Sequence, residues 1–272
     1  MNVLTLLTPW LPSPLVMVLT ALAAGLYLRG CRHERVPWYR QLSYWLGLFL
    51  VYLAMHSRWD YYAEREFFIH RAQHAVLHHL GPFLIALSWP GPALLAGLPA
   101  GWRERWLQPL QATWPVRAVL AVLTNPIVTG VLFFGLIWLW LVPDIHFFVM
   151  LDVHLYRLMN WSMLLDGLLF WYLVLDPRPS PPARLSPGTR VVLLIAVIPP
   201  QMVSGAMIAF ATHNIYPLYE LCGRAFGGIT ALDDQTLGGL ILWIPGTMMS
   251  LAGALFALYF WYRSKEGAPA PK

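Results

Sequence analysis

Charged residues are scarce in this sequence, and the familiar signatures of soluble enzymes are missing from it. Asp, Glu, Lys and Arg together make up 11% of the 272 residues, whereas hydrophobic residues make up 58%. That composition lies well outside the usual range of a soluble globular domain. Because no GxSxG, P-loop, HExxH or GxGxxG motif occurs, hydrolase, nucleotide-binding and zinc-protease activities have no support, and we predict that the protein is not an enzyme.

Cysteine and an N-terminal basic cluster are also lacking. The two cysteines, Cys31 and Cys222, form no CxxC motif, which excludes the thiolate copper or zinc site of small metallochaperones. Residues 1–8 contain no Lys or Arg, so the first apolar run lacks the basic start of a cleaved secretory signal. We therefore expect this run to remain as a helix.

Long apolar runs dominate the sequence instead. Lipid offers no hydrogen-bond partners to the backbone, so a chain can cross it only as helices or as a closed barrel, and unbroken runs favour helices. The runs long enough to cross about 30 Å of hydrocarbon cover residues 12–28, 41–55, 67–89, 118–141, 153–175, 190–211 and 236–262. We predict an all-α membrane bundle of about seven transmembrane helices, with kinks at Pro199-Pro200 and Pro245.

The positions of Lys and Arg predict how this bundle lies in the membrane. Alternate connections and the C-terminal segment carry most of them: Arg29, Arg32, Arg35, Arg40, Arg103, Arg105, Arg117, Arg178, Arg184, Arg190, Arg263, Lys265 and Lys272. By the positive-inside rule the N-terminus lies outside and the C-terminus in the cytoplasm. The net charge of +5 thus reflects basic residues that orient the protein in the membrane, and we expect no nucleic-acid partner. No connection is long enough for a soluble core, so residues 1–272 are predicted to form one transmembrane domain.

This topology gathers most of the nine histidines at the outer face. Third-span histidines His70, His74 and His78 follow one helical stripe at i, i+4 and i+8. Imidazoles one turn apart can ligate one ion, and neutral imidazole suits copper, zinc, iron and nickel. His70 and His74 are the best candidate pair for a metal, and His154, at the outer start of the fifth span, is the most economical third ligand.

Further side chains are candidates to assist this site. They are His78, His213, Asp233, Asp234 and the methionines Met159, Met163, Met202 and Met207, whose sulfur suits cuprous ion. A simpler role competes with each histidine: at an interface the ring can anchor in the headgroups, and His78 or His79 can be a buried hydrogen-bonding residue. We expect Arg71, beside the pair, to reach the headgroups or to pair with Glu64 or Glu66.

Three stretches of the sequence share features with one known family. They are Phe68 to His74 followed by His78, His79 and Gly81-Pro82-Phe83-Leu84, then Asp166-Gly-Leu-Leu-Phe-Trp171, and Asp233-Asp-Gln-Thr-Leu-Gly-Gly-Leu-Ile-Leu-Trp-Ile-Pro-Gly246. Over residues 40–262 the chain resembles the CtaG family of cytochrome c oxidase assembly factors. The resemblance implies a seven-helix membrane protein that serves copper delivery to, or assembly of, a haem-copper oxidase.

The chain departs from the family pattern on the fifth span. Members of the family usually carry two histidines about four residues apart before the Gly-Leu-Leu-Phe-Trp stretch, where this helix offers His154, Tyr156 and Asn160. We expect Asn160 to stand in the place of a family histidine, and His154 or His146 to compensate.

The resulting prediction is a copper-binding assembly factor of the bacterial inner membrane, with the metal site facing outward and assisted by Asp234 or His213. Its expected partners are the lipid bilayer and either the subunits of a haem-copper oxidase or a periplasmic copper chaperone; a homodimer is left open. One alternative is a haem-binding redox protein, because histidines on facing helices can ligate haem. Another is an assembly scaffold that needs no metal.

Overall fold

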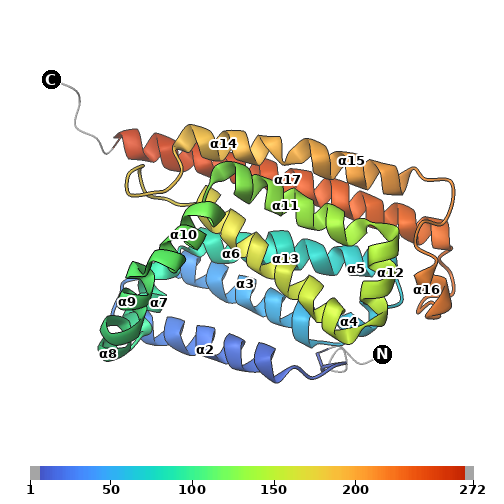
Figure 1. Ribbon diagram of the computed structural model, residues 1–272, viewed down its shortest axis with the longest axis horizontal. Coiled ribbons are helices and arrows are strands. Elements are labelled where there is room, and N and C mark those ends of the chain that lie inside the picture. The colour runs from blue at the N-terminus through green and yellow to red at the C-terminus, as the bar shows by residue number, and fades with distance from the viewer. Residues whose placement is uncertain (1–6, 267–272) are drawn as a thin grey trace.

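The computed structural model describes residues 7–266, and within that range every regular element is a helix. The all-α prediction is therefore confirmed. Long helical segments follow the predicted runs and lie roughly along one axis (Figure 1): α2 (Pro14–Gly30), α3 (Trp38–His56), α5 (Phe67–His74) with η1 (Ala75–Leu80) and α6 (Gly81–Ser88), α11 (Pro126–Leu141), α13 (Val153–Val174), α14 (Pro187–Ala196) with α15 (Ile198–Ala209), and α17 (Ala231–Glu266).

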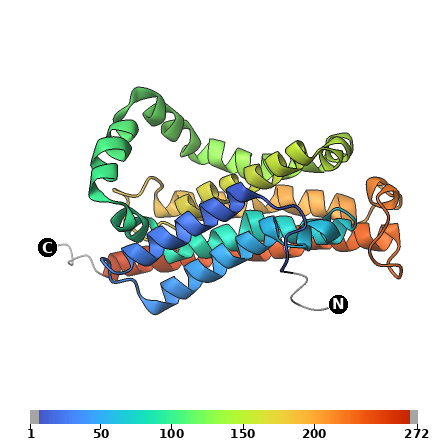
Figure 2. The same ribbon diagram turned by 90° about the horizontal axis from the view of Figure 1, so that it is seen from below.

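Shorter helices connect these segments at the two ends of the bundle. They are α4 (Trp59–Ala63), α7 (Gly91–Gly97), α8 (Ala100–Trp102), η2 (Arg103–Leu107), α9 (Gln108–Ala112), α10 (Trp114–Leu123), α12 (Pro143–Leu151) and α16 (Leu218–Leu221). The arm from α8 to α10 stands away from the long helices (Figure 2), whereas α7 packs against α2, with the Ala93 backbone at Gly30 and the Leu26 backbone at Gly97. The basic connections and the end of α17 lie at one end of the bundle, and α4, α12 and α16 lie at the other (Figure 1).

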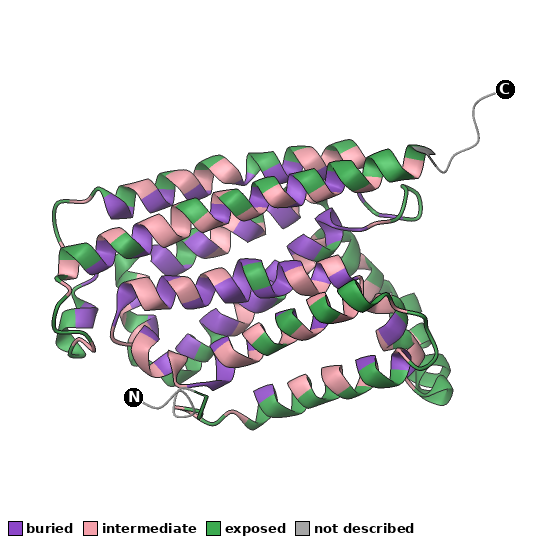
Figure 3. Ribbon diagram, turned by 180° about the vertical axis from the view of Figure 1, so that it is seen from behind, coloured by how far each residue is buried: buried purple, intermediate pink, exposed green. Residues whose placement is uncertain are grey.

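The membrane character of the chain is supported by its most apolar helices. Pro187–Ala209 and Ala231–Lys265 are each long and apolar enough to cross a membrane, and the number rises to four if two bent helix pairs each count as one span. Side chains such as Leu15, Met207 and Leu255 are exposed on the outer helices, whose outer faces are largely exposed or half-buried (Figure 3). Such an apolar surface suits lipid rather than water.

The predicted span 118–141 is not straight, which corrects the sequence prediction, whereas the third run, 67–89, bends only at its C-terminal end. The 118–141 run breaks between α10 and α11, which meet at 68°. Pro126 disfavours helix at the residue before it, and the Asn125 side chain instead accepts hydrogen bonds from the backbone N–H groups of Ile127 and Val128, so it caps α11. The third segment bends by 72° before α7, at Trp89, whose φ is 51°.

The proline-containing helices behave differently from one another. Val197 separates α14 from α15 just before Pro199-Pro200, as predicted, whereas α17 runs continuously through Pro245. The proline-rich stretch after α13 is a non-helical connection, and the buried Arg190 side chain holds it by donating hydrogen bonds to the carbonyls of Leu185 and Asp176.

Glycines of the family-like stretches allow the central helices to pack closely. A Cβ on Gly167 of α13 would lie 2.5 Å from the backbone oxygen of His78 in η1, and the Trp171 indole donates a 3.1 Å hydrogen bond to that same oxygen. A Cβ on Gly239 of α17 would lie 2.7 Å from the backbone oxygen of Gly205 in α15. A methyl group at either position would push the helices apart, so these glycines set where η1 and α15 lie.

Candidate functional site: a buried histidine cluster

The paired histidines of α5 lie together in the protein interior. The His70 and His74 ring centroids are 4.4 Å apart, as their spacing of one helical turn predicts. After His74 the chain continues as the π-helix η1, whose hydrogen bonds reach one residue further than those of an α-helix. Within η1 the His78 ring lies 4.8 Å from that of His79 and 4.2 Å from that of Phe133, between centroids.

Ring nitrogens without hydrogen-bond partners distinguish this pair. His70 is fully buried and neither of its ring nitrogens makes a hydrogen bond; the Ala63 carbonyl is near the ring but lacks hydrogen-bond geometry. In His74, Nε2 lies 3.1 Å from Oδ1 of Asn160, whereas Nδ1 has no partner. A buried polar group left unpaired costs about 1–3 kcal/mol, so these nitrogens are available to a ligand.

A third imidazole approaches the pair from α12. The ring of His146 lies 5.2 Å from that of His70, measured between centroids. Its Nδ1 lies 3.0 Å from the Trp140 carbonyl and its Nε2 lies 2.9 Å from the Tyr219 hydroxyl. Nδ1 must donate to the carbonyl, so Nε2 accepts from the hydroxyl. Burial lowers the pKa of His146 to about 3, which keeps the ring neutral at physiological pH.

The fifth-span candidate His154 does not join the cluster. It is exposed on the first turn of α13, where its backbone N–H is capped by Asp152. The same helix instead presents Asn160 to His74 and Tyr156 to His70, with 6.0 Å between the last two ring centroids. Asn160 is thus the α13 side chain that contacts the pair through a hydrogen bond to His74.

The candidates His213 and Asp234 also lie outside the pair's immediate surroundings. His213 is exposed, and its backbone carbonyl accepts a hydrogen bond from Gln235. Asp234 is buried and accepts hydrogen bonds from the backbone N–H groups of Phe67 and Phe68, at 3.0 and 2.7 Å. A carboxylate at these N–H groups stabilises the start of α5, so Asp234 positions the histidine helix.

Arg71 lies in the interior, and our expectation that it reaches the headgroups or a neighbouring carboxylate is wrong. Its exposed fraction is 3%. Glu66 instead pairs with Arg224, at 2.7 Å, and Arg224 also lies 3.1 Å from Asp234. The loop before α17 thus supplies the cation that these two acids share, a contact between residues distant in sequence.

A continuous hydrogen-bonded chain crosses the bundle beside the pair. His78 Nε2 lies 3.0 Å from Oδ2 of Asp166, His78 Nδ1 lies 3.3 Å from Nδ1 of His79, and His79 Nε2 lies 3.0 Å from Oε1 of Gln201. Both ring nitrogens of His78 are engaged, which matches the buried hydrogen-bonding role considered for it and leaves it no free nitrogen for a metal. The chain ties α13, η1 and α15 together.

A second polar network, missed in the sequence, supports the pair from the side of α4. Gln73 Nε2 lies 2.6 Å from Oδ1 of Asp60, and the Tyr156 hydroxyl lies 3.1 Å from both Asp60 Oδ1 and Gln73 Oε1. Burial raises the pKa of Asp60 to about 6, although the hydrogen bonds from Gln73 and Tyr156 oppose the rise. Only the adjacency of Gln73 to His74 in the sequence hinted at this network.

The space beside the histidines is small. A cavity of about 20 Å³, enough for about one water molecule, is lined by Arg71, His74, Ala75, His79, Ile137, Met163, Ile241, Leu242 and Gly246. Within residues 7–266, no group of three or more His, Cys, Asp or Glu side chains has the arrangement of a metal site. Two imidazoles with free nitrogens suit a cuprous ion, which accepts low coordination, better than zinc, which requires four ligands.

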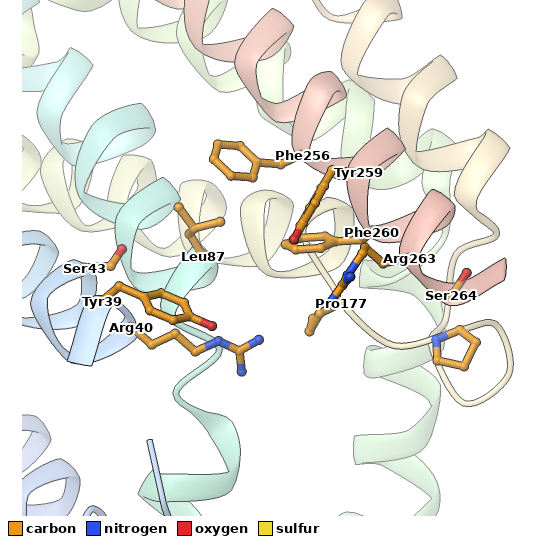
Figure 4. Close-up of a pocket in the computed structure, with 11 residues that line it drawn as sticks. Tyr39, Arg40, Ser43, Leu87, Pro177, Phe256, Tyr259, Phe260, Arg263 and Ser264 are labelled. Atoms are coloured by element: carbon orange, nitrogen blue, oxygen red, sulfur yellow. The ribbon is translucent and has the colours of Figure 1, made fainter. Parts of the chain in front are cut away.

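A larger cavity of about 650 Å³ lies at the other end of the bundle (Figure 4). Arg40 of α3 and Arg263 of α17 flank it, with Tyr259 and Phe260 on its wall (Figure 4). It holds none of the histidines and is separate from the cluster.

Comparison with known proteins agrees with the sequence resemblance. Residues 21–264 match the family model described as cytochrome c oxidase caa3 assembly factor (Caa3_CtaG). No curated protein and no solved structure matches the chain.

Proposed function

The chain belongs to the cytochrome c oxidase caa3 assembly factor family, and from that membership we propose that it supports oxidase maturation by holding one copper ion at His70 and His74, without catalysing a reaction. The observation that carries the proposal is a pair of buried imidazoles one helical turn apart with three unpartnered ring nitrogens. A bound ion would satisfy nitrogens that otherwise remain buried and unpaired.

The surroundings of the pair favour cuprous ion over harder cations. No carboxylate lines the adjoining cavity, but the Met163 side chain does, and thioether sulfur is a ligand that cuprous ion accepts. His146 is the nearest third imidazole and would become a ligand only if Nε2 gave up its hydrogen bond from Tyr219. Asn160 holds His74 by Nε2, which directs the free Nδ1 of that ring toward a ligand.

The position of the pair supports a site on the outer side of a bacterial inner membrane. We propose that the seven long helical segments each cross the membrane, with the N-terminus outside and the C-terminus in the cytoplasm. The histidine helix α5 begins beside α4, at the bundle end opposite the basic connections (Figure 1). A site near that end would exchange copper with a periplasmic chaperone or with the oxidase subunits.

The two alternatives receive less support. Haem ligation was expected to pair His70 or His74 with His154, but His154 is exposed and the cavity beside His74 measures about 20 Å³, far too little for a porphyrin. The scaffold alternative is supported by the chain of His78, His79 and Gln201, which is fully engaged in joining helices. It leaves the free nitrogens of His70 unexplained.

Metal content of the purified protein tests the proposal. We expect about one copper per chain in the wild type and none in the double variant His70→Ala/His74→Ala. The matched control is His154→Ala/His213→Ala, which removes two exposed histidines and should keep the copper. Undiminished copper in the His70/His74 variant would refute the site, and normal oxidase maturation in cells that carry this copper-free variant would favour the scaffold.

A further inference from the structure

Arg71 presents a charge that the structure leaves without a counterion. Its guanidinium is almost fully buried, and its Nε and Nη2 make no hydrogen bond. The ring of Phe67, four residues earlier on α5, has its centroid 5.2 Å from the guanidinium carbon. Removing a charge from water without a partner is among the most costly changes in a protein interior, so a group that compensates this charge is required.

The carboxylates nearest to Arg71 in the fold are already used. Glu66 accepts hydrogen bonds from Arg224 and from the backbone N–H groups of Ala225 and Phe226. Asp234 is shared between Arg224 and the first N–H groups of α5. The ionisable groups that face Arg71 are imidazoles and phenols: His70, His74, His146, Tyr156, Tyr216 and Tyr219.

Arg71 lines the small cavity beside the histidines, and no carboxylate lines it. His74 lines the same cavity, but its Nε2 donates to Asn160 Oδ1 and its Nδ1 therefore keeps a lone pair, so Arg71 is the hydrogen-bond donor that an anion would meet here. The remaining lining is His79 and apolar side chains, with the backbone of Gly246. A Cβ on Gly246 would lie 2.5 Å from Gln201 Oε1 and 3.6 Å from His79 Nε2, so the glycine of the Trp-Ile-Pro-Gly stretch keeps this wall open.

We propose that this cavity binds one small monovalent anion, of the size of chloride, at the unpartnered Nε and Nη2 of the Arg71 guanidinium. The space is about that of one water molecule, which suits a monatomic ion better than phosphate or a carboxylate. The anion would neutralise a buried charge that no carboxylate reaches, and apolar walls would exclude the water that competes with it.

This anion site stands independently of copper, but it has a consequence that rests on the proposed function. A cuprous ion at His70 and His74 would add positive charge beside Arg71, and the two charges would repel strongly in a poorly solvated interior. A bound anion reduces that repulsion.

Thermal unfolding of the metal-free protein in detergent tests the anion site. Bromide, compared with gluconate at equal ionic strength, should raise the Tm of the wild type saturably, because a ligand stabilises the state that binds it in proportion to ln(1 + [L]/Kd). The rise should be lost in Arg71→Met, retained in Arg71→Lys, and retained in Arg117→Met, which removes an exposed arginine. A wild type without halide dependence, or an unchanged dependence in Arg71→Met, would overturn the proposal.

Anomalous scattering from crystals grown in bromide provides a readout that needs no variant. A bromide peak beside Arg71 supports the site, whereas a peak elsewhere only, or no peak, means that water fills the cavity. Halide dependence without copper binding would leave the anion site standing and remove the copper proposal, so the two failures are distinguishable.

Discussion

Gly167 provides a sharp test of how the family-like Gly-Leu-Leu-Phe-Trp stretch positions the histidine segment. A Cβ at this position would lie 2.5 Å from the backbone oxygen of His78 and 3.0 Å from its carbonyl carbon and Cα. These are backbone atoms of η1, so they cannot rotate away as a side chain would. Gly167→Ala must push η1 and α13 apart, which also strains the hydrogen bond from Trp171 to the same oxygen.

A second helical glycine isolates the magnitude of this effect. Gly135 of α11 has no atom within 4 Å of its ideal Cβ position, so Gly135→Ala should stabilise the protein by up to about 1 kcal/mol through helix propensity alone. Gly167→Ala gains the same helix propensity, but overpacking lowers its free energy of unfolding by about 1–3 kcal/mol. Because the propensity contribution cancels, we expect the free energies of unfolding of the two variants to differ by about 1–3 kcal/mol.

Thermal unfolding in a single detergent measures this difference directly. For a chain of this size, about 1 kcal/mol corresponds to roughly 2–4 °C in Tm, so Gly167→Ala should unfold several degrees below Gly135→Ala. Copper content measured on the same samples reports whether the displaced η1 also disturbs the histidine pair. Equal Tm values for the two variants would refute the close approach of α13 to η1.

Three further predictions concern the surroundings of the pair. Asp234→Ala should lower the free energy of unfolding by about 1–2 kcal/mol through loss of the α5 cap, and Glu104→Ala, at an exposed acidic residue, should change Tm little. The pKa of Asp60 is about 6 in the folded state, above its unfolded value of about 3.9. Between these two pH values the folded state therefore binds more protons than the unfolded state. The Tm of the wild type should rise as pH falls from 7 to 5, and the Tm of Asp60→Asn should rise less. Asn160→Ala should weaken copper binding about tenfold or more, because the amide oxygen that accepts from His74 Nε2 and orients the ring is lost, as competition with a cuprous chelator would show; unchanged affinity would argue against copper at His74.

The apolar runs predict the helices well because hydrophobicity and length are local properties. Each predicted run corresponds to a helical segment, and even the extension of the second run to His56 is confirmed. The bend within residues 118–141 was missed because the run stays apolar through it. The Asn125-Pro126 dipeptide predicts that a helix is interrupted and begins again at this point. In the structure Asn125 does cap the start of α11.

In the candidate site, too, local spacing predicts some contacts and helix packing decides the others. His70 and His74 meet because one helical turn separates them, which any α-helix guarantees. The third group could not be chosen from spacing, since α13 carries both His154 and Asn160 and these positions point about 120° apart around a helix. Which of them faces the pair depends on the rotation of α13, and Gly167 and Trp171 set that rotation against η1.

By itself, then, the sequence determined the helical class, the segregation of basic residues to alternate connections, the histidine pair and the family. Only the tertiary structure decided which groups surround the pair. Arg71 is next to His70 and five residues from Glu66, yet Glu66 pairs with Arg224 and Arg71 is left buried. The reason is physical: contacts within one helical turn follow from backbone geometry, whereas ion pairs between distant segments follow from how whole helices pack.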